Sequence, residues 1–543
     1  MPLSDTPPPG ASPLWRAPLR LPVAVEPSDV VPFGTVDGAP PDRPVLTLHG
    51  EEIHLADLAL RLLGFSDCGL YVRARHLVRV SYGTPRPGGG IARDATAPVI
   101  ELIDAAILRE RLARVADWRK KTAKGDQEIL PPPWMVEMIL ACQRWPFPVL
   151  EGVVDAPTLR PDGSVLAAPG YDPLTGLLLH PSGRFPAVPD RPTPADCAAA
   201  RTALEEPFRD FPFRDAGDLS AALAAVLSLV ARPAIPGCVP LFAVRATTPG
   251  TGKGLLADVV CLIGTGRPGA RMTPEADDTE MRKRVLSIAL AGDAVVLLDN
   301  VEGALGSPAL AAALTSETFK DRILGASTMA EAPLRAVWIS TGNNTTFRGD
   351  LGRRVVPIDL VADREHPEDR AADEFAHPDL LAWVVRHRPP LVTAALTLLR
   401  AYHVAGRPRG DLGPRFGSFE SWDALVRGCV VWCGYADPLA GRTRLRAEDD
   451  TDRVALAGAL RALRDAYGPQ AFTARDAVDR ATEMPALREA LLDFASYRDG
   501  LHAQRLGTAF KKAAGRIVDG LSVQRAFDAH AKTATWCVVE HHI

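Results

Sequence analysis

One stretch of sequence decides the fold of this chain: Ala246-Thr247-Thr248-Pro249-Gly250-Thr251-Gly252-Lys253-Gly254-Leu255-Leu256. It follows an apolar segment, Val239 to Ala246, with the composition of a buried strand, and it opens a helical segment that runs through Val260. Small residues between a strand and a helix let successive backbone N–H groups face an anion, and the helix dipole adds positive charge. We therefore predict a P-loop in which Thr248 to Leu255 bind ATP and Lys253 reaches its β and γ phosphates.

Two positions of this loop depart from the usual pattern G-x-x-x-x-G-K-[ST]. Thr247 stands where the first glycine is usual, and Gly254 stands where a serine or threonine usually binds Mg²⁺. A glycine-rich turn that carries Lys253 on the surface is the alternative interpretation. Polar residues in the following segments favour the P-loop.

An acidic residue ends the next apolar strand. The run Ala294 to Asn300 is typical of a buried parallel strand that delivers a carboxylate to the metal beside a P-loop. We predict that Asp299 binds Mg²⁺. Glu302 follows closely enough to polarise the attacking water, although Asn300 occupies the position where many motors place that glutamate.

An amide ends a further apolar strand, Arg335 to Thr341, which runs into Gly342-Asn343-Asn344. At the end of a strand beside a P-loop, the amide of Asn343 would orient a water molecule against the γ phosphate. A buried turn asparagine is the alternative interpretation.

Paired arginines precede the last apolar strand of this region, Val355 to Leu360. In the run Asp350-Leu351-Gly352-Arg353-Arg354, either guanidinium suits an arginine finger that neutralises transition-state charge in a neighbouring subunit. As isolated arginines, Arg353 and Arg354 would instead form surface salt bridges.

In this order, the segments from Val239 to Leu360 resemble the compact helicase core of superfamily 3, AAA+-related motors of phage and plasmid primase-helicases and other mobile-element replication proteins. The resemblance includes an F-K-D-R-x-L-G element, Phe319 to Gly325, which in that family forms a hairpin that grips DNA in a central channel. It implies that Phe319, Lys320 and Arg322 contact DNA. A core phenylalanine flanked by solvated charges is the alternative.

The resemblance implies an ATPase that uses Mg²⁺ and couples hydrolysis to DNA unwinding or translocation. It also implies a homo-oligomeric ring, expected to be a hexamer, with single-stranded DNA in its channel and replication proteins as further partners. Two other classes stay open. One is an AAA+-like nucleotide switch or DNA-binding scaffold without efficient hydrolysis, and the other is a nucleoside-phosphate kinase, which Leu255 and the lack of an arginine-rich lid disfavour.

Composition sets the broad class of the protein. The 543 residues are 47% hydrophobic and 24% charged, which is typical of globular domains, and the net charge of -4 gives no overall basic field for nucleic acid. The eight cysteines include no C-x-x-C pair, so we expect no structural zinc site. Without a signal-peptide pattern or a long apolar run, we expect a cytoplasmic protein without membrane contact.

We predict a multidomain α/β protein with a parallel-sheet, AAA+-like ATPase core. Its expected regions are a proline-rich arm (1–44), an N-terminal α+β domain (45–151), a hairpin-rich connector (152–192), the P-loop ATPase domain (193–370), a helical region (371–449) and a winged-helix-like domain (450–543).

Three further segments carry specific expectations. Arg119, Lys120, Lys121 and Lys124 are placed at the end of a helix over Ala106 to Trp118, and Pro389-Pro390 is expected to break the helix His377 to Val404. In the C-terminal domain, Lys511, Lys512 and Arg516 border a predicted recognition helix and would contact DNA phosphates. A winged helix used only for protein contacts is the alternative.

Overall fold

The computed structural model describes residues 43–48, 52–65, 69–82, 91–92, 94, 96–274, 277–322, 329–495, 500–526 and 534–541. Its contacts divide the chain into two compact units, Met1–Cys68 with Ala105–Ala141, and Gly69–Asp104 with Cys142–Ile543. Nearly all of the expected proline-rich arm, 1–44, lies outside the described residues.

The smaller unit is an α+β unit. Its elements are β1 (Val45–Leu48), α1 (Glu52–Phe65), α2 (Ala105–Val115), β6 (Asp117–Thr122), β7 (Gly125–Ile129) and α3 (Pro133–Ala141). The sheet order is β1-β6-β7, with β1 parallel to β6 and β7 antiparallel to it. The core includes Leu63, Leu108 and Trp118, whose indole Nε1 donates to the Leu112 carbonyl at 2.8 Å.

The expected helix end in this unit is wrong. Arg119, Lys120 and Lys121 lie on strand β6, and Lys124 lies in the turn that leads to β7. Helix α2 ends at Val115. Trp118 fits the helical spacing of apolar residues, but it is buried as part of strand β6. A large buried side chain is compatible with either period, so apolar spacing could not decide between them.

The larger unit is built on a mixed sheet whose first five strands are parallel. The order is β19-β13-β18-β15-β14-β4, and β4 pairs antiparallel with β14. The strands are β13 (Leu241–Ala246), β14 (Ala270–Met272), β15 (Val295–Leu305), β18 (Val337–Phe347), β19 (Val355–Leu360) and β4 (Ile91–Ala92). The predicted parallel-sheet core is confirmed at this level, and β15 and β18 extend beyond their expected ends.

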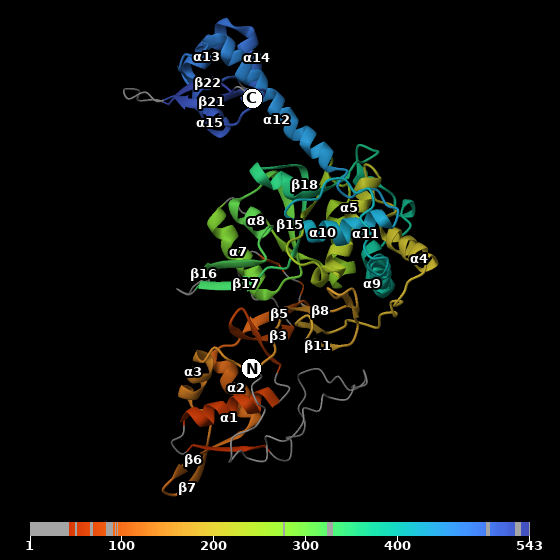
Figure 1. Ribbon diagram of the computed structural model, residues 1–543, viewed down its shortest axis with the longest axis vertical. Helices are drawn as coiled ribbons and strands as arrows, with labels where there is room; N and C mark the ends of the chain where they lie inside the picture. Colours follow the sequence, from red (N-terminus) through yellow and green to blue (C-terminus); the bar gives the residue numbers. More distant parts are fainter. Residues whose placement is uncertain are drawn as a thin grey trace, which may run out of the picture. The chain divides into compact units, whose positions relative to one another are not determined.

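Helices cover both faces of this sheet, because alternate strand residues point to opposite sides. Phe242 and Val244 pack into a core with α5 (Ala216–Val230), α6 (Lys253–Thr265) and α9 (Leu380–Val404). Leu241 and Ala243 pack on the other face with α7 (Asp278–Ala291) and α8 (Pro308–Ala313). Figure 1 shows α7 and α8 to one side of β15 and β18, and α5 and α9 to the other.

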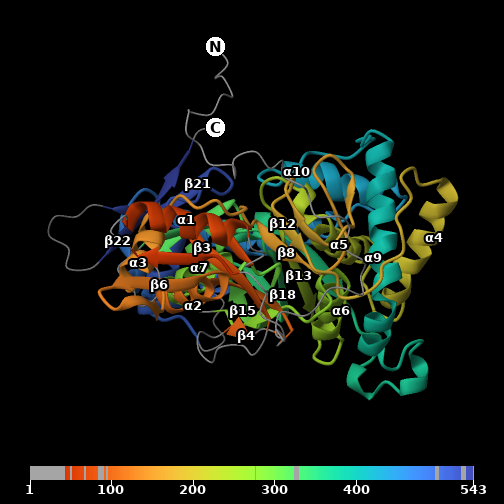
Figure 2. The same ribbon diagram turned by 90° about the horizontal axis from the view of Figure 1, so that it is seen from below.

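Smaller elements surround this core. They are β2 (Leu70–Arg73), β3 (His76–Tyr82), β5 (Pro98–Leu102), β8 (Gly152–Val154), β9 (Thr158–Leu159), β10 (Val165–Leu166), β11 (Gly170–Asp172), β12 (Leu177–Leu179), α4 (Pro194–Glu205), the hairpin β16 (Thr318–Arg322) and β17 (Met329–Pro333), α10 (Glu420–Trp422) and α11 (Gly428–Trp432). Helices α4 and α9 run side by side (Figure 2).

Two expectations about the larger unit need correction. The segment 69–104 belongs to this unit rather than to an N-terminal domain 45–151, because β4 joins the main sheet and Arg73 donates to the carbonyls of Ala289 and Pro333. Helix α9 also continues through Pro389 and Pro390. Leu391, Val392 and Ala395 bury its second half in the core, and this packing outweighs the loss of two backbone donors.

The C-terminal residues form a helical and sheet region after one long helix, α12 (Arg442–Tyr467). Its elements are β20 (Phe472–Thr473), α13 (Ala474–Glu483), α14 (Pro485–Ala495), α15 (Ala503–Ala513), β21 (Leu521–Ala526) and β22 (Thr535–Glu540), with sheet order β20-β22-β21. They follow the predicted order of helices and a terminal strand pair. In the described part of the chain, we find no helix with both the length and the apolar character needed to cross a bilayer.

Candidate functional site

The predicted loop lies between β13 and α6 and turns at two positions that favour glycine. Gly250 and Gly252 have φ angles of 77° and 90°, in the left-handed region that favours glycine. The Thr251 hydroxyl, in a residue that is only 5% exposed, donates to the Thr248 carbonyl at 2.6 Å. The loop thus holds its own shape, with the amino end of α6 at its exit.

Lys253 has the environment of an anion-binding lysine. Its Nζ lies 3.4 Å from both the Thr248 carbonyl and the Thr251 hydroxyl, and it forms no ion pair with any residue the structure describes. Burial lowers the pKa of Lys253 from its usual value. A half-buried ammonium with two long contacts can also bind a phosphate group, which is the role predicted for Lys253 from the sequence.

The strand registers bring the other predicted residues to the same edge of the sheet. Asn343 is the Cα partner of Ala246, the residue before the loop, and also of Glu302 on the other side. The Asn343 side-chain oxygen is buried without a hydrogen-bond partner, while Glu302 is exposed. An unpaired buried acceptor beside a P-loop is compatible with an amide that needs an external donor such as water.

Asp299 sits at a bulge where β15 shifts register between Leu298 and Val301. Its Oδ1 accepts from the Thr341 hydroxyl at 2.7 Å and from the Asn300 N–H at 3.1 Å. Asn300 has a φ of 51°, a left-handed conformation that asparagine tolerates better than most residues. The bulge aims the carboxylate to the carboxyl edge of the sheet, where ligands of such sheets bind.

Sequence reasoning missed two charged residues that contact Asp299 or its partner. Arg271, on β14, donates from Nη1 to Asp299 Oδ2 at 2.5 Å and from Nη2 to both Asp258 oxygens at 2.5 and 2.6 Å. Burial raises the pKa of Asp258 despite this partner. Both residues could have been found in the sequence, because each is a charged residue inside an apolar segment, Leu255 to Ile263 or Ala270 to Met272.

A third missed residue, Glu368, lies against the loop. A Cβ atom added to Gly250 would stand 2.4 Å from Glu368 Oε2, so this carboxylate rests on the loop backbone. Gly254 is the opposite case, because a Cβ added there would meet nothing within 4 Å. The loop therefore has open space where the usual pattern places a serine or threonine side chain.

The paired arginines have different environments. The side chain of Arg354 is 15% exposed, and it donates to the Ala311 carbonyl at 2.7 Å and pairs with Asp350 at 2.6 Å. The side chain of Arg353 is 69% exposed and also pairs with Asp350. Both precede Val355, which pairs with the first residue of the six-residue strand β13. A strand of that length spans about 17 Å, so neither guanidinium reaches the P-loop of its own chain.

The predicted DNA-gripping element forms an antiparallel hairpin of β16 and β17, and its tip, 323–328, lies outside the described residues. Phe319 is 6% exposed and belongs to the core, which disfavours the predicted stacking of its ring on a base. Lys320 and Arg322 are exposed. Their contact with DNA stays a prediction.

Cations of the C-terminal region lie on its surface. Lys511 and Lys512 are exposed in the last turn of α15, and Arg516 is exposed three residues beyond its end. None of the three forms an ion pair with another described residue. Their predicted contact with DNA phosphates stays a prediction.

The residues at the carboxyl edge fit a magnesium nucleotide. Loop N–H groups and Lys253 suit the phosphates, and one carboxylate, Asp299, suits Mg²⁺, which in nucleotide sites usually keeps water and phosphate as its other ligands. Among the described residues, no group of three or more His, Cys, Asp or Glu side chains forms a metal site without a ligand.

Comparison with known proteins gives weak likenesses. No protein-family model matches the chain, and no curated protein matches it. The apo C-terminal region of NrS-1 is 12% identical over 85% of this chain and 96% of that chain, with a TM-score of 0.33. The SCCmec type IV Cch helicase is 10% identical over 88% of this chain and 98% of that chain, with a TM-score of 0.30. The JCV helicase is 13% identical over 44% of this chain and 66% of that chain, with a TM-score of 0.19. TM-scores this low carry no argument about function. We infer the function from the residues of this chain instead.

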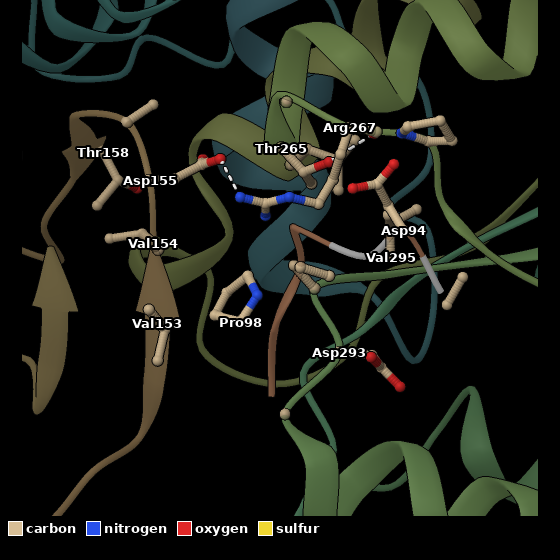
Figure 3. A pocket seen from close by; sticks show the side chains of 18 of the residues that line it. Asp94, Pro98, Val153, Val154, Asp155, Thr158, Thr265, Arg267, Asp293 and Val295 are labelled. Atoms are coloured by element: carbon tan, nitrogen blue, oxygen red, sulfur yellow. Dashed lines mark hydrogen bonds and ion pairs between the residues drawn. The ribbon is translucent and has the colours of Figure 1, made fainter. Parts of the chain in front are cut away.

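Two adjoining cavities lie at the other edge of the sheet. One of 90 Å³ is lined by Val295 and by Arg267, which pairs with Asp155 at 2.7 Å (Figure 3), and the other encloses 270 Å³ beside Arg335. Val295 and Arg335 stand at the amino ends of β15 and β18. Ligands of open α/β sheets bind at the carboxyl ends of the strands, whereas these cavities lie at the edge opposite the predicted P-loop.

Proposed function

We propose that the chain is an ATP-dependent DNA helicase or replication motor of a phage, plasmid or other mobile element, and that it acts as a ring of identical subunits. One observation carries the proposal. The strand registers pair Asn343 with Ala246, the residue before the predicted P-loop, and with Glu302, three residues after Asp299. A glycine-rich turn that merely carries Lys253 on the surface would not explain why an amide and two acids lie at the same edge of the sheet.

The proposed mechanism assigns one task to each side chain. Loop N–H groups and Lys253 hold the β and γ phosphates, and Asp299 would hold Mg²⁺, which would supply neutralisation of the phosphate charge. Asn343 orients the attacking water with its unpaired amide oxygen, and Glu302 accepts a proton from that water. Arg353 of a neighbouring subunit stabilises the charge that develops in the transition state, since its own P-loop is out of reach.

DNA contacts are proposed on two surfaces. Lys320 and Arg322 on the β16–β17 hairpin are exposed cations, although Lys320 lies 3.9 Å from Glu331 of the facing strand. Lys511, Lys512 and Arg516 lie where a winged helix would contact the phosphate backbone. These contacts would position DNA rather than read its sequence, because point charges bind phosphates without distinguishing bases.

The decisive experiment measures ATP hydrolysis by the full chain with and without single-stranded DNA, beside Lys253→Ala. We expect turnover that DNA stimulates and that the alanine variant loses by a factor of about 10² or more, the loss typical of removing one preorganised cation from a transition state. Arg284→Ala is the control and should keep the activity, because this half-buried arginine of α7 donates to the Thr273 carbonyl at 3.0 Å and has no role in the proposed mechanism. Turnover that survives Lys253→Ala would refute the assignment of this loop.

A nucleotide switch without efficient hydrolysis is the second candidate, and Gly254 together with the Arg271–Asp299 contact favours it. The same assay separates the two. Lys253-dependent binding of ATP without turnover, in the presence of DNA, would select the switch. Phosphate transfer to a nucleoside monophosphate would instead select the kinase.

A further inference from the structure

The guanidinium of Arg271 stands between two carboxylates that come from different elements. Nη1 contacts Asp299 Oδ2 at 2.5 Å, and Nη2 contacts both oxygens of Asp258 on α6. The side chains of Arg271 and Asp299 are 34% and 35% exposed, whereas Asp258 is 15% exposed. Asp258, the more buried carboxylate, contacts Arg271 through both of its oxygens. Asp299, the more exposed one, contacts it through one oxygen.

Asp258 is placed to act on the same site as the P-loop. It follows Gly254 by four residues on α6, so both lie on one face of the helix. Helical side chains lean toward the amino end, which brings the Asp258 carboxylate toward the turn that contains Gly254. The space beside Gly254 is open, since a Cβ there would meet nothing within 4 Å.

The oxygens of Asp299 already have donors. Oδ1 accepts from the Thr341 hydroxyl and the Asn300 N–H, and Oδ2 accepts from Arg271. A divalent cation cannot share Oδ2 with a guanidinium, because two positive groups at contact distance repel each other. Binding of a metal to Asp299 therefore requires that Arg271 withdraw, and its two contacts with Asp258 give it a place to stay.

We propose that Arg271 is a positioning residue that occupies Asp299 in the absence of metal and moves fully to Asp258 when Mg²⁺ and nucleotide bind together. This inference rests on the proposed function of the P-loop edge. A free metal would have one carboxylate with which to displace a guanidinium. A metal that arrives with the nucleotide brings phosphate ligands as well, so the site admits the metal with the nucleotide and discriminates against the metal alone.

Replacing Arg271 and replacing Asp258 should change metal affinity in opposite directions. Removing the guanidinium in Arg271→Gln frees Asp299, so affinity for metal without nucleotide rises, by about tenfold for a close charge pair. Removing the other acceptor in Asp258→Asn leaves Arg271 with Asp299 as its single acidic partner, so metal affinity falls. A merely structural arginine would lower metal affinity in both variants. Arg271→Lys keeps the positive charge, so its affinity for metal without nucleotide should stay nearly as low as that of the parent protein.

The test uses Mn²⁺ as a paramagnetic substitute for Mg²⁺, with free Mn²⁺ measured by electron paramagnetic resonance in the presence of the full chain. Each protein is titrated alone and with a non-hydrolysable ATP analogue, and Asp299→Asn identifies the site. Arg267→Gln is the matched control, because Arg267 also forms a part-buried pair with an aspartate, Asp155, at 2.7 Å but at the other edge of the sheet. Circular dichroism confirms that each variant is folded.

Opposite shifts in Arg271→Gln and Asp258→Asn, with no shift in Arg267→Gln, would support the inference. Shifts in the same direction, or none, would overturn it even if the parent hydrolyses ATP. If the parent neither hydrolyses ATP nor binds Mn²⁺ with the analogue, the proposed function fails, and the titrations without nucleotide still decide the role of Arg271.

Discussion

Gly254 leaves space at the second position of α6, where a P-loop usually carries a hydroxyl group. A Cβ there meets nothing within 4 Å, so a small side chain fits without moving any neighbour. Gly254→Ser should therefore fold normally and gain a few tenths of a kcal/mol in helix stability. If the hydroxyl reaches the metal, the Mg²⁺ concentration needed for half-maximal ATP turnover should fall by several-fold.

Gly254→Ala is the matched control for that prediction, because it makes the same change to the backbone without a hydroxyl. A Mg²⁺ titration of turnover and a thermal melt of both variants separate the two effects. Equal Mg²⁺ requirements in the serine and alanine variants would show that no metal ligand belongs at this position, and Asp299 would then be the only protein ligand we assign.

At the scale of elements, a network of ion pairs joins the strand before the P-loop to the start of α12. Asp359 on β19 accepts from Arg245 on β13 at 2.9 Å and from Arg444 on α12 at 3.0 Å. Arg444 also contacts both oxygens of Asp218 on α5, at 2.7 and 2.8 Å. Burial raises the pKa of Asp218 to about 6, against the opposing effects of the Asp359 N–H and Arg444.

That shift predicts a pH dependence with a definite sign. The unfolded chain releases the Asp218 proton near pH 4, whereas the folded chain keeps it until about pH 6, so this group's contribution to the free energy of unfolding falls as pH rises through that window. The fall is at most about 3 kcal/mol, because solvent screening reduces the effect. In urea unfolding over this range, Asp218→Asn should gain stability relative to the parent as pH rises. A constant difference would mean that Asp218 is ionised throughout and simply pairs with Arg444.

The C-terminal helix α15 gives a second prediction at this scale. Lys511 and Lys512 are exposed and unpaired among the described residues, so each can release a counterion from DNA. Replacing both by glutamine should weaken DNA binding uniformly across sequences and reduce the slope of log affinity against log salt by roughly 1.5. Lys283→Gln, whose lysine already pairs with Glu280 at 2.6 Å, should change neither. An unchanged slope would favour a protein-contact role for this region.

Elements whose signal is local could be predicted from sequence, and those set by distant partners could not. The strand, loop and helix around Lys253 depend on neighbouring residues, and the structure has them where expected. Phe319 was ambiguous because only packing against a distant core decides whether a strand phenylalanine is buried. Helix α9 passes through Pro389 for the same reason, and Arg271 reaches Asp299 only because β14 lies beside β15.

At the scale of the whole molecule, the proposed ring depends on an arginine that one chain offers to the next. Both arginines pair with Asp350, but 69% of the Arg353 side chain is exposed, whereas the Arg354 side chain is 15% exposed and also donates to the Ala311 carbonyl of its own chain. Arg353→Ala should therefore lower ATP turnover by about 10³-fold with little effect on folding, and Arg354→Ala should lower the thermal midpoint.

Mixing two inactive variants tests whether the site is shared. Arg353→Ala subunits keep an intact P-loop, and Lys253→Ala subunits keep an intact finger, so an interface between them in one orientation is complete. In an equal mixture that assembles at random, about a quarter of the interfaces combine the two intact halves, and turnover should recover in that proportion. Neither variant alone recovers activity at the same total concentration. If the mixture stays inactive although both variants assemble with nucleotide and DNA, Arg353 does not act across the interface, and the ring mechanism loses the residue on which it depends.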